Sequence, residues 1–183
     1  MNEFEICILA GGKSSRMGED KGLMSLFGKP MISYVITELS KLGLPMTISS
    51  NNPAYKRFDL PVVNDTLKDI GPLGGIHSAL SRTKSKKVII VSCDVPYVTA
   101  ELISDMMKDS EGFEVVLPSF DGQIHPLIGI YDSTILPHIQ KQAELGNLKI
   151  TLAIESLKLK LKDANDYEKI NFKNLNSKSD IHA

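Results

Sequence analysis

The chain has 183 residues, 42% of them hydrophobic and 23% charged, and its formal net charge at pH 7 is -1. This length allows one sizeable core and is short for two typical domains, so residues 1–183 are predicted to form a single domain. The basic residues are dispersed, which argues against a protein that binds duplex nucleic acid or an anionic membrane. The sequence has neither a long apolar run nor a signal-peptide pattern, which predicts cytoplasmic residence.

The first predicted element is a buried strand, the apolar run Phe4–Leu9. It ends at Gly11-Gly12, followed by a segment rich in hydroxyl groups and cations that includes Arg16 and Lys21. Glycines let the backbone turn sharply and bring its N–H groups close to an anion, because no Cβ intervenes. The pattern favours a phosphate-binding loop over an ordinary surface turn with a solvated basic face. Its spacing fits neither the P-loop nor the Gly-x-Gly-x-x-Gly dinucleotide motif.

Helices and strands alternate in the next part of the chain. Apolar residues repeat at helical spacing over Ile32–Leu39, and Gly43 is placed to end that helix. Short strands are predicted at Met46–Ser50 and Leu60–Asn64, and a second helix at Gly71–Arg82. The glycines that open this second helix allow a ligand close to its N-terminus, where free N–H groups favour negative charge.

The most continuous apolar run, Lys87–Cys93, is typical of a central parallel strand that is covered on both faces. It stops at Asp94, and Thr99 is placed to cap a helix containing Leu102–Met107. Strand and helix thus alternate over the first 110 residues or so, which predicts right-handed crossovers and a parallel sheet.

The pattern is less regular in the remainder of the chain. Strands are predicted at Val115–Pro118 and Pro126–Tyr131, joined by a turn at Asp121-Gly122. Ser133 is predicted to cap a helix that tolerates Pro137 only in its first turn. A further helix is predicted over Ile150–Leu157.

Leucines and lysines alternate over Leu157–Lys162, which predicts a strand with one buried and one solvated face whose lysines protect a sheet edge. The segment Phe172–Ser179 is polar, and a composition of this kind is typical of a fraying end. Cys7 and Cys93 lie in separate apolar runs and outside any paired-cysteine motif, so both are predicted to be buried hydrophobic residues without redox or metal chemistry.

In an open α/β sheet, ligands bind at the carboxyl ends of the strands, near the point where the strand order reverses. Polar or glycine residues follow the predicted strands at such ends, namely Gly11-Gly12, Asn51, Asp65 and Asp94. We therefore expect one crevice to hold them. The lone residues His77 and His125 have no second ligand at metal spacing and are assigned no catalytic role.

The two aspartates each have two interpretations. A hard carboxylate at the edge of a phosphate site suits Mg²⁺, which makes Asp94 the metal candidate, whereas an aspartate after a strand can also be a helix cap. A carboxylate can accept two hydrogen bonds from the Watson–Crick edge of guanine, which makes Asp65 a candidate for base recognition. Its alternative is a turn residue.

Several blocks of the sequence resemble the molybdenum cofactor guanylyltransferases in order and spacing. They are Leu9–Lys21, Gly28–Pro30, Asn64-Asp65, Gly71–Ile76, Cys93–Tyr97, His125-Pro126 and Phe172–Asn176. The resemblance implies a Rossmann-like, three-layer α/β nucleotidyltransferase fold with a mostly parallel central sheet. It also implies an enzyme that uses GTP and Mg²⁺ to attach GMP to molybdopterin bearing molybdenum, with release of pyrophosphate.

The resemblance also implies site residues. The GTP-binding residues of the family correspond to Leu9, Ala10, Gly11, Lys21, Asp65 and Asp94, and we add Gly12, Asn51 and Gly75 as expected GTP contacts. Asp94 is also the expected Mg²⁺ ligand, and Arg16, Lys21 and Asp94 are the expected catalytic residues. The family often has an asparagine at the position of Ser49, so either Asn51 takes over that contact or the contact is lost.

The resemblance places Asn174 and Asn176 on the molybdopterin side, which predicts an ordered C-terminal segment despite its composition. It also allows contact with molybdenum-insertion and molybdoenzyme maturation proteins. Two alternatives remain open at this point. One is the same chemistry with CTP or with a sugar or alditol phosphate, and the other is a catalytically inactive nucleotide-binding assembly module.

Overall fold

A computed structural model describes residues 2–11, 20–64, 67, 70–176 and 180. Its centre is a mixed sheet with the strand order β10-β7-β9-β6-β1-β4-β5, and the short β8 pairs with β7. The strands are β1 (Phe4–Leu9), β4 (Met46–Ser49), β5 (Val62–Val63), β6 (Lys87–Ser92), β7 (Val115–Phe120), β8 (Gln123–Ile124), β9 (Ile128–Asp132) and β10 (Leu159–Asp163). β1 is parallel to both of its neighbours, and β9 is antiparallel to β6 and β7.

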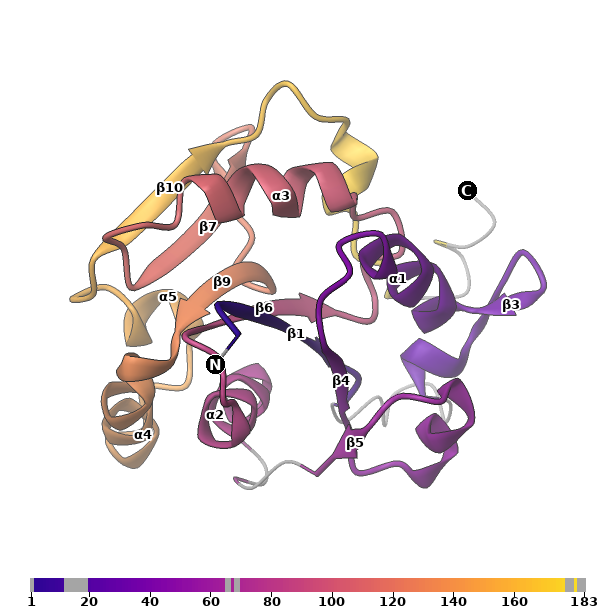
Figure 1. The fold of residues 1–183 in the computed structure, drawn as a ribbon, viewed down its shortest axis with the longest axis horizontal. Helices are drawn as coiled ribbons and strands as arrows, with labels where there is room; N and C mark the ends of the chain where they lie inside the picture. The colour runs from indigo at the N-terminus through magenta and orange to yellow at the C-terminus, as the bar shows by residue number, and fades with distance from the viewer. Residues whose placement is uncertain (1, 12–19, 65–66, 68–69, 177–179, 181–183) are drawn as a thin grey trace.

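Helices cover both faces of the sheet, which makes three layers (Figure 1). They are α1 (Met31–Ser40), α2 (Pro72–Arg82), α3 (Ala100–Lys108), α4 (Leu136–Glu144) and α5 (Ile150–Ala153). Apolar residues of α1 and α3 form one core cluster, and those of α2, α4 and α5 form the other. Successive residues of β1 alternate between them, Ile6 and Ile8 in the first, Cys7 and Leu9 in the second, because side chains of a strand point to opposite faces. The predicted α/β class is confirmed.

The first part of the chain follows the prediction closely. The helices α1, α2 and α3 form where the apolar repeats predicted them, and the Thr99 hydroxyl accepts a hydrogen bond from the N–H of Leu102 at 3.2 Å. The strand predicted at Leu60–Asn64 is shorter, because only Val62–Val63 pairs with β4. Cys7 and Cys93 are both buried, as predicted.

Two details of the second part of the sheet differ from the prediction. The turn at Asp121-Gly122 joins β7 to β8 rather than to β9, and β9 then lies between β6 and β7. The cap before α4 is Asp132 and not Ser133, since the Asp132 carboxylate accepts a hydrogen bond from the N–H of Thr134 at 3.0 Å. An ionised carboxylate is the stronger acceptor of the two, and the short 3-10 helix η3 (Ser133–Ile135) leads from it into α4.

The strand β10 lies at the sheet edge, as its lysines predicted, but its expected division into a buried and a solvated face is wrong at one position. Leu161 is 43% exposed, because the apolar cluster that covers Leu157 and Leu159 does not extend to it. Lys162 is instead held by Asp109 at 2.8 Å. The helix predicted over Ile150–Leu157 is also reduced, to the single turn of α5.

A third, smaller apolar cluster brings the C-terminal segment next to the first helix. It contains Met24, Leu26, Met31 and Leu175. Leu26, in the hairpin of β2 (Ser25–Leu26) and β3 (Lys29–Pro30), belongs to this cluster. The chain also forms the 3-10 helices η1 (Lys21–Leu23), η2 (Pro53–Phe58) and η4 (Lys169–Phe172). The described part of the C-terminal segment thus packs against the fold through Leu175, in line with the order that the resemblance predicted. Within the described ranges, no helix is both long enough and apolar enough to cross a bilayer.

Candidate active site

The strand order reverses at β1, because the next strands of this sheet along the chain, β4 and β5, lie on one side of it and β6 lies on the other. The carboxyl ends of β1 and β6 therefore lie side by side and lead into Gly11 and Asp94. The N–H of Cys93 donates to the carbonyl of Leu9 at 3.0 Å, and the N–H of Ala10 donates to the carbonyl of Ser49 at 2.9 Å. These bonds define a switch point of the kind at which α/β sheets bind ligands.

Lys21 brings two distant parts of the chain together at this point. The helix η1 places its ammonium nitrogen 3.6 Å from a carboxylate oxygen of Asp94. The same nitrogen donates a hydrogen bond to the side-chain oxygen of Asn176 at 2.6 Å. Three residues predicted to belong to the site, from three separate regions of the sequence, thus meet at one cation.

Asp94 has the features of a metal ligand. The residue is 8% exposed, and its Oδ1 atom is buried and has no hydrogen-bond partner among the described residues. No group of three histidine, cysteine or acidic residues suitable for a metal occurs in the described ranges. A single carboxylate of this kind fits Mg²⁺, which usually takes one or two carboxylates and completes its octahedron with water and substrate phosphates.

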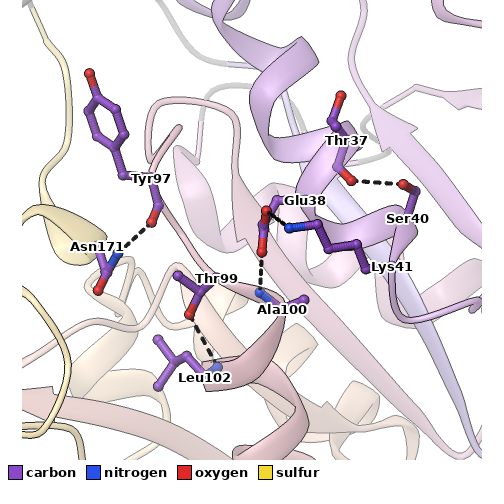
Figure 2. Close-up of polar contacts among 9 residues, drawn as sticks. All are labelled: Thr37, Glu38, Ser40, Lys41, Tyr97, Thr99, Ala100, Leu102 and Asn171. Atoms are coloured by element: carbon purple, nitrogen blue, oxygen red, sulfur yellow. Dashed lines mark hydrogen bonds and ion pairs between the residues drawn. The ribbon is translucent and has the colours of Figure 1, made fainter.

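The loop after Asp94 is fixed from two sides, and Figure 2 shows the contacts. From the C-terminal part, Asn171 donates to the carbonyl of Tyr97 at 2.8 Å. From α1, the Glu38 carboxylate accepts the N–H of Ala100 at 3.0 Å. Burial alone would raise the pKa of Glu38, but the bonds from Lys41 and Ala100 outweigh it and lower that pKa, so the carboxylate stays ionised as an acceptor.

The carboxylate of Asp20, next to Lys21 in the chain, has hydrogen-bond partners at both oxygens. Both oxygens of Asp20 accept hydrogen bonds: Oδ1 from the Tyr55 hydroxyl and from the N–H of Gly22, Oδ2 from the side chain of Asn52. Sequence reasoning assigned no role to Asp20, Asn52 or Tyr55. The Asn52-Pro53 pair was an available signal, because asparagine before proline is typical of a helix start, and Asn52 does cap η2.

Two glycines near the site lie where a Cβ would crowd neighbouring side chains. A Cβ at Gly22 would contact the Tyr55 hydroxyl and lie 3.0 Å from the sulfur of Cys93. A Cβ at Gly75 would lie 3.1 Å from both terminal methyl carbons of Leu9. Gly75 was predicted to allow close approach of a nucleotide, but the group that approaches it in the structure is the side chain of Leu9 in β1.

The other predicted residues have varied positions. Leu9 and Ala10 have buried side chains, 7% and 2% exposed, so contact with a ligand there falls to the backbone. Asn51, Asn174 and Gly11 are exposed at the surface. The predictions for Gly12, Arg16 and Asp65 lie outside the described residues. A cavity of about 520 Å³ lies elsewhere, near the amino ends of β1 and β6, with Glu5, Arg82 and Ser85 in its lining.

The thiol next to the site is not a reactive group. Burial raises the pKa of Cys93 well above its ordinary value, and the neighbouring carboxylates of Asp94 and Asp20 raise it further. The described part of the site therefore offers one ammonium, one carboxylate with an unpartnered oxygen, and amide groups. Groups of these types bind phosphates and a divalent cation and stabilise charge, and they need no nucleophile from the protein.

The fold and this arrangement define an α/β nucleotidyltransferase. Residues 6–158 match the model of the MobA-like NTP transferase domain, and the chain belongs to that family.

Named relatives agree with this family. The chain is 35% identical over 161 residues to a probable molybdenum cofactor guanylyltransferase of Carboxydothermus hydrogenoformans, covering 88% of this chain and 82% of the relative. It is also 35% identical over 179 residues to the molybdenum cofactor guanylyltransferase of Vibrio atlanticus, covering 95% and 91%. The structure of molybdopterin-guanine dinucleotide biosynthesis protein A from Archaeoglobus fulgidus shares the fold, with a TM-score of 0.83, 22% identity, and coverage of 97% and 95%.

Proposed function

We propose that this protein transfers GMP from GTP to molybdopterin bearing molybdenum, releasing pyrophosphate and forming the guanine dinucleotide form of the cofactor. The observation that carries the proposal is the position of Lys21, between Asp94 and Asn176. The resemblance assigns these two residues to the nucleotide side and the pterin side of the reaction. The names of the curated relatives support the same substrates.

The reaction is an in-line displacement at phosphorus. An oxygen of the terminal phosphate of molybdopterin forms a bond to the α-phosphorus of GTP, and the bond from that phosphorus to the bridging oxygen of the β-phosphate breaks. Pyrophosphate leaves with the bonding electrons. Because the attacking phosphate is already an anion, no strong general base is needed, and catalysis rests on positioning and charge stabilisation.

We assign the residues accordingly. Lys21, with Arg16 and the amides of Gly11-Gly12, neutralises the leaving pyrophosphate, and Asp94 holds the divalent cation. When bound, Mg²⁺ would supply charge stabilisation for the reacting phosphates. The unpartnered oxygen of Asp94 supports this assignment.

The remaining site residues are assigned to contacts with GTP and with the pterin. Asp65 recognises the guanine edge, with the backbone of Leu9-Ala10, Asn51 and Gly75 completing the GTP site. Asn174 and Asn176 face the pterin. We further propose that the chain acts as one domain in the cytoplasm.

The decisive experiment measures pyrophosphate release with molybdopterin and Mg²⁺, comparing GTP, CTP and ATP at equal concentrations. The proposal expects release that requires molybdopterin and is fastest with GTP. Faster release with CTP would establish the cytidylyl alternative. Release only when a sugar phosphate replaces molybdopterin would identify the sugar phosphate as the acceptor. An absence of release with every nucleotide, together with GTP binding, would favour the inactive binding module.

A further inference from the structure

The carboxylate of Asp20 is held by groups from two different elements. The Tyr55 hydroxyl donates to Oδ1, which also accepts the N–H of Gly22 at 3.2 Å. The amide of Asn52 donates to Oδ2 at 3.0 Å. Tyr55 belongs to η2 and Asn52 caps it, whereas Asp20 caps η1, the helix that begins at Lys21. The residue directly before the site lysine is thus tied to the segment that follows β4.

The Tyr55 side of this connection is buried and closely packed. Tyr55 is 0% exposed, and burial raises the pKa of its phenol well above the ordinary value, so the hydroxyl remains a hydrogen-bond donor. Gly22 lies against both the Tyr55 hydroxyl and the sulfur of Cys93 without room for a Cβ. Since Cys93 adjoins Asp94 in the chain, the same contacts fix the backbone beside Lys21 relative to the backbone beside Asp94.

Lys21 needs such fixing because a lysine side chain has four rotatable bonds and the ammonium is a point charge without directional preference of its own. Its side chain is 32% exposed, so packing of the side chain restrains it only in part. The position of the ammonium near Asp94 and Asn176 therefore depends on where the backbone of η1 begins. Asp20 determines that point by its cap bond to Gly22.

We propose that Asp20, Asn52 and Tyr55, together called the Asp20 clamp, are positioning residues that hold the Lys21 ammonium between Asp94 and Asn176. The clamp does not touch the substrates and acts through Lys21. Its effect on turnover rests on the proposed function, whereas its effect on the location of Lys21 does not.

The test uses Tyr55→Phe, which removes the hydroxyl that donates to Asp20 and keeps the ring. The matched control is Tyr167→Phe, because the Tyr167 hydroxyl also donates to an aspartate, Asp105, at 2.8 Å, but on α3 away from Lys21. Each variant is measured for thermal unfolding, for kcat/KM with GTP, and for acylation of Lys21 by an amine-reactive ester. Acylation is quantified by mass spectrometry against the exposed Lys86 in the same sample.

The clamp predicts that Tyr55→Phe raises the acylation rate of Lys21 several-fold, because an amine that is no longer held between Asp94 and Asn176 is more accessible to the ester. It also predicts a fall in kcat/KM on the order of tenfold or more, as expected when a catalytic group is misplaced. Tyr167→Phe leaves both quantities within about twofold. Equal effects of the two variants, or unchanged Lys21 acylation in Tyr55→Phe, would overturn the proposal.

Asn52→Ser is the second variant, in case Tyr55→Phe does not fold. Serine retains a cap for the N–H of Ala54, which Asn52 now accepts at 3.0 Å, but lacks the amide that donates to Asp20. The clamp predicts the same direction of change, again with faster acylation of Lys21; no change would count against it. If the parent protein releases no pyrophosphate, the proposed function fails, and the acylation rates still decide the clamp.

Discussion

Asp94 differs from the other aspartates of the described chain in having a buried carboxylate oxygen without a hydrogen-bond partner. Such an atom is costly in a folded protein, and the cost is accepted where a ligand completes the group. The helix-cap alternative for Asp94 loses support, because the side chain that caps α3 is that of Thr99. What remains is a carboxylate suited to a cation.

Replacing Asp94 by asparagine tests this interpretation. Asparagine keeps the size of the side chain but removes the negative charge that the metal needs, so Mg²⁺-dependent turnover should fall by roughly 10² or more while the thermal midpoint stays close to that of the parent. Asp109→Asn is the control, since Asp109 pairs with Lys162 outside the site. Retained activity in Asp94→Asn at saturating Mg²⁺ would remove Asp94 from metal binding.

Lys21→Ala should lower turnover with GTP far more than it lowers stability. A lost charged contact to a transition state commonly costs about 2 to 4 kcal/mol, whereas a partly exposed lysine contributes about 0.5 kcal/mol or less to folding. Lys86→Ala is the matched control, an exposed lysine before the amino end of β6. Steady-state kinetics and a thermal melt of both variants provide the comparison, and equal kinetics would mean that the phosphate site lies elsewhere.

At the scale of elements, the hairpin of β2 and β3 departs from its preferred turn residues. Phe27 and Gly28 form a two-residue turn between Leu26 and Lys29, and both have positive φ, +46° and +83°. Asparagine followed by glycine is the preferred pair there, because a bulky side chain is strained in the left-handed region. Phe27 is also 75% exposed, so packing of its side chain offsets little of this backbone strain.

Phe27→Asn should therefore stabilise the protein, by about 0.5 to 1 kcal/mol. For a chain of this size, that corresponds to a rise in thermal midpoint of roughly 1 to 4 °C. Leu145→Asn is the control, because Leu145 is 63% exposed but has a negative φ of -77°, so no backbone strain is relieved. An equal rise in both variants would attribute the effect to lost surface hydrophobicity instead.

At the scale of the whole molecule, stability should fall in acid in two pH windows. Burial lowers the pKa of His77 and of His125 below 6.5, so the unfolded chain binds protons first and stability decreases as the pH falls below about 6.5. The carboxyl of Asp132, despite its burial, has a pKa lowered by bonds from Thr134 and Lys87. Its contribution is present above about 3.8 and is lost as the pH falls through its folded-state pKa.

The first window can be tested with His125→Gln. The variant should lose less unfolding free energy than the parent between pH 7.5 and pH 5.5, by at most about 1.4 kcal/mol per pH unit for one proton. Urea titrations at both pH values provide the measurement. Between pH 7.5 and pH 9 the two proteins should change in parallel, because the histidine is neutral there in both states; a difference confined to that range would contradict the assignment.

The periodicity of apolar residues was sufficient to predict the α/β class and the central strands, because a strand covered on both faces, such as β6, must be apolar throughout. Lys21 and Asp94 were predicted as site residues because ligand groups follow the ends of strands, whereas Asn174 and Asn176 were predicted only from the resemblance to the family. Which strands become neighbours in the sheet, and which residues its edge leaves exposed, was decided only by the tertiary structure. The insertion of β9 between β6 and β7 is one case, and the exposure of Leu161 at the sheet edge is another.

The same limit applies to the site. No local pattern pairs Asp20 with Tyr55, which lies 35 residues away, or Lys21 with Asn176, which lies 155 residues away, because these hydrogen bonds exist only after β1, β4 and β6 have aligned. Gly75 shows the reverse case, a glycine in a recognised motif whose missing Cβ accommodates Leu9. The sequence by itself determined which residue types are available for phosphate and metal chemistry. The fold decided which of these residues contact the Lys21 ammonium, because proximity across a sheet depends on strand order and not on separation along the chain.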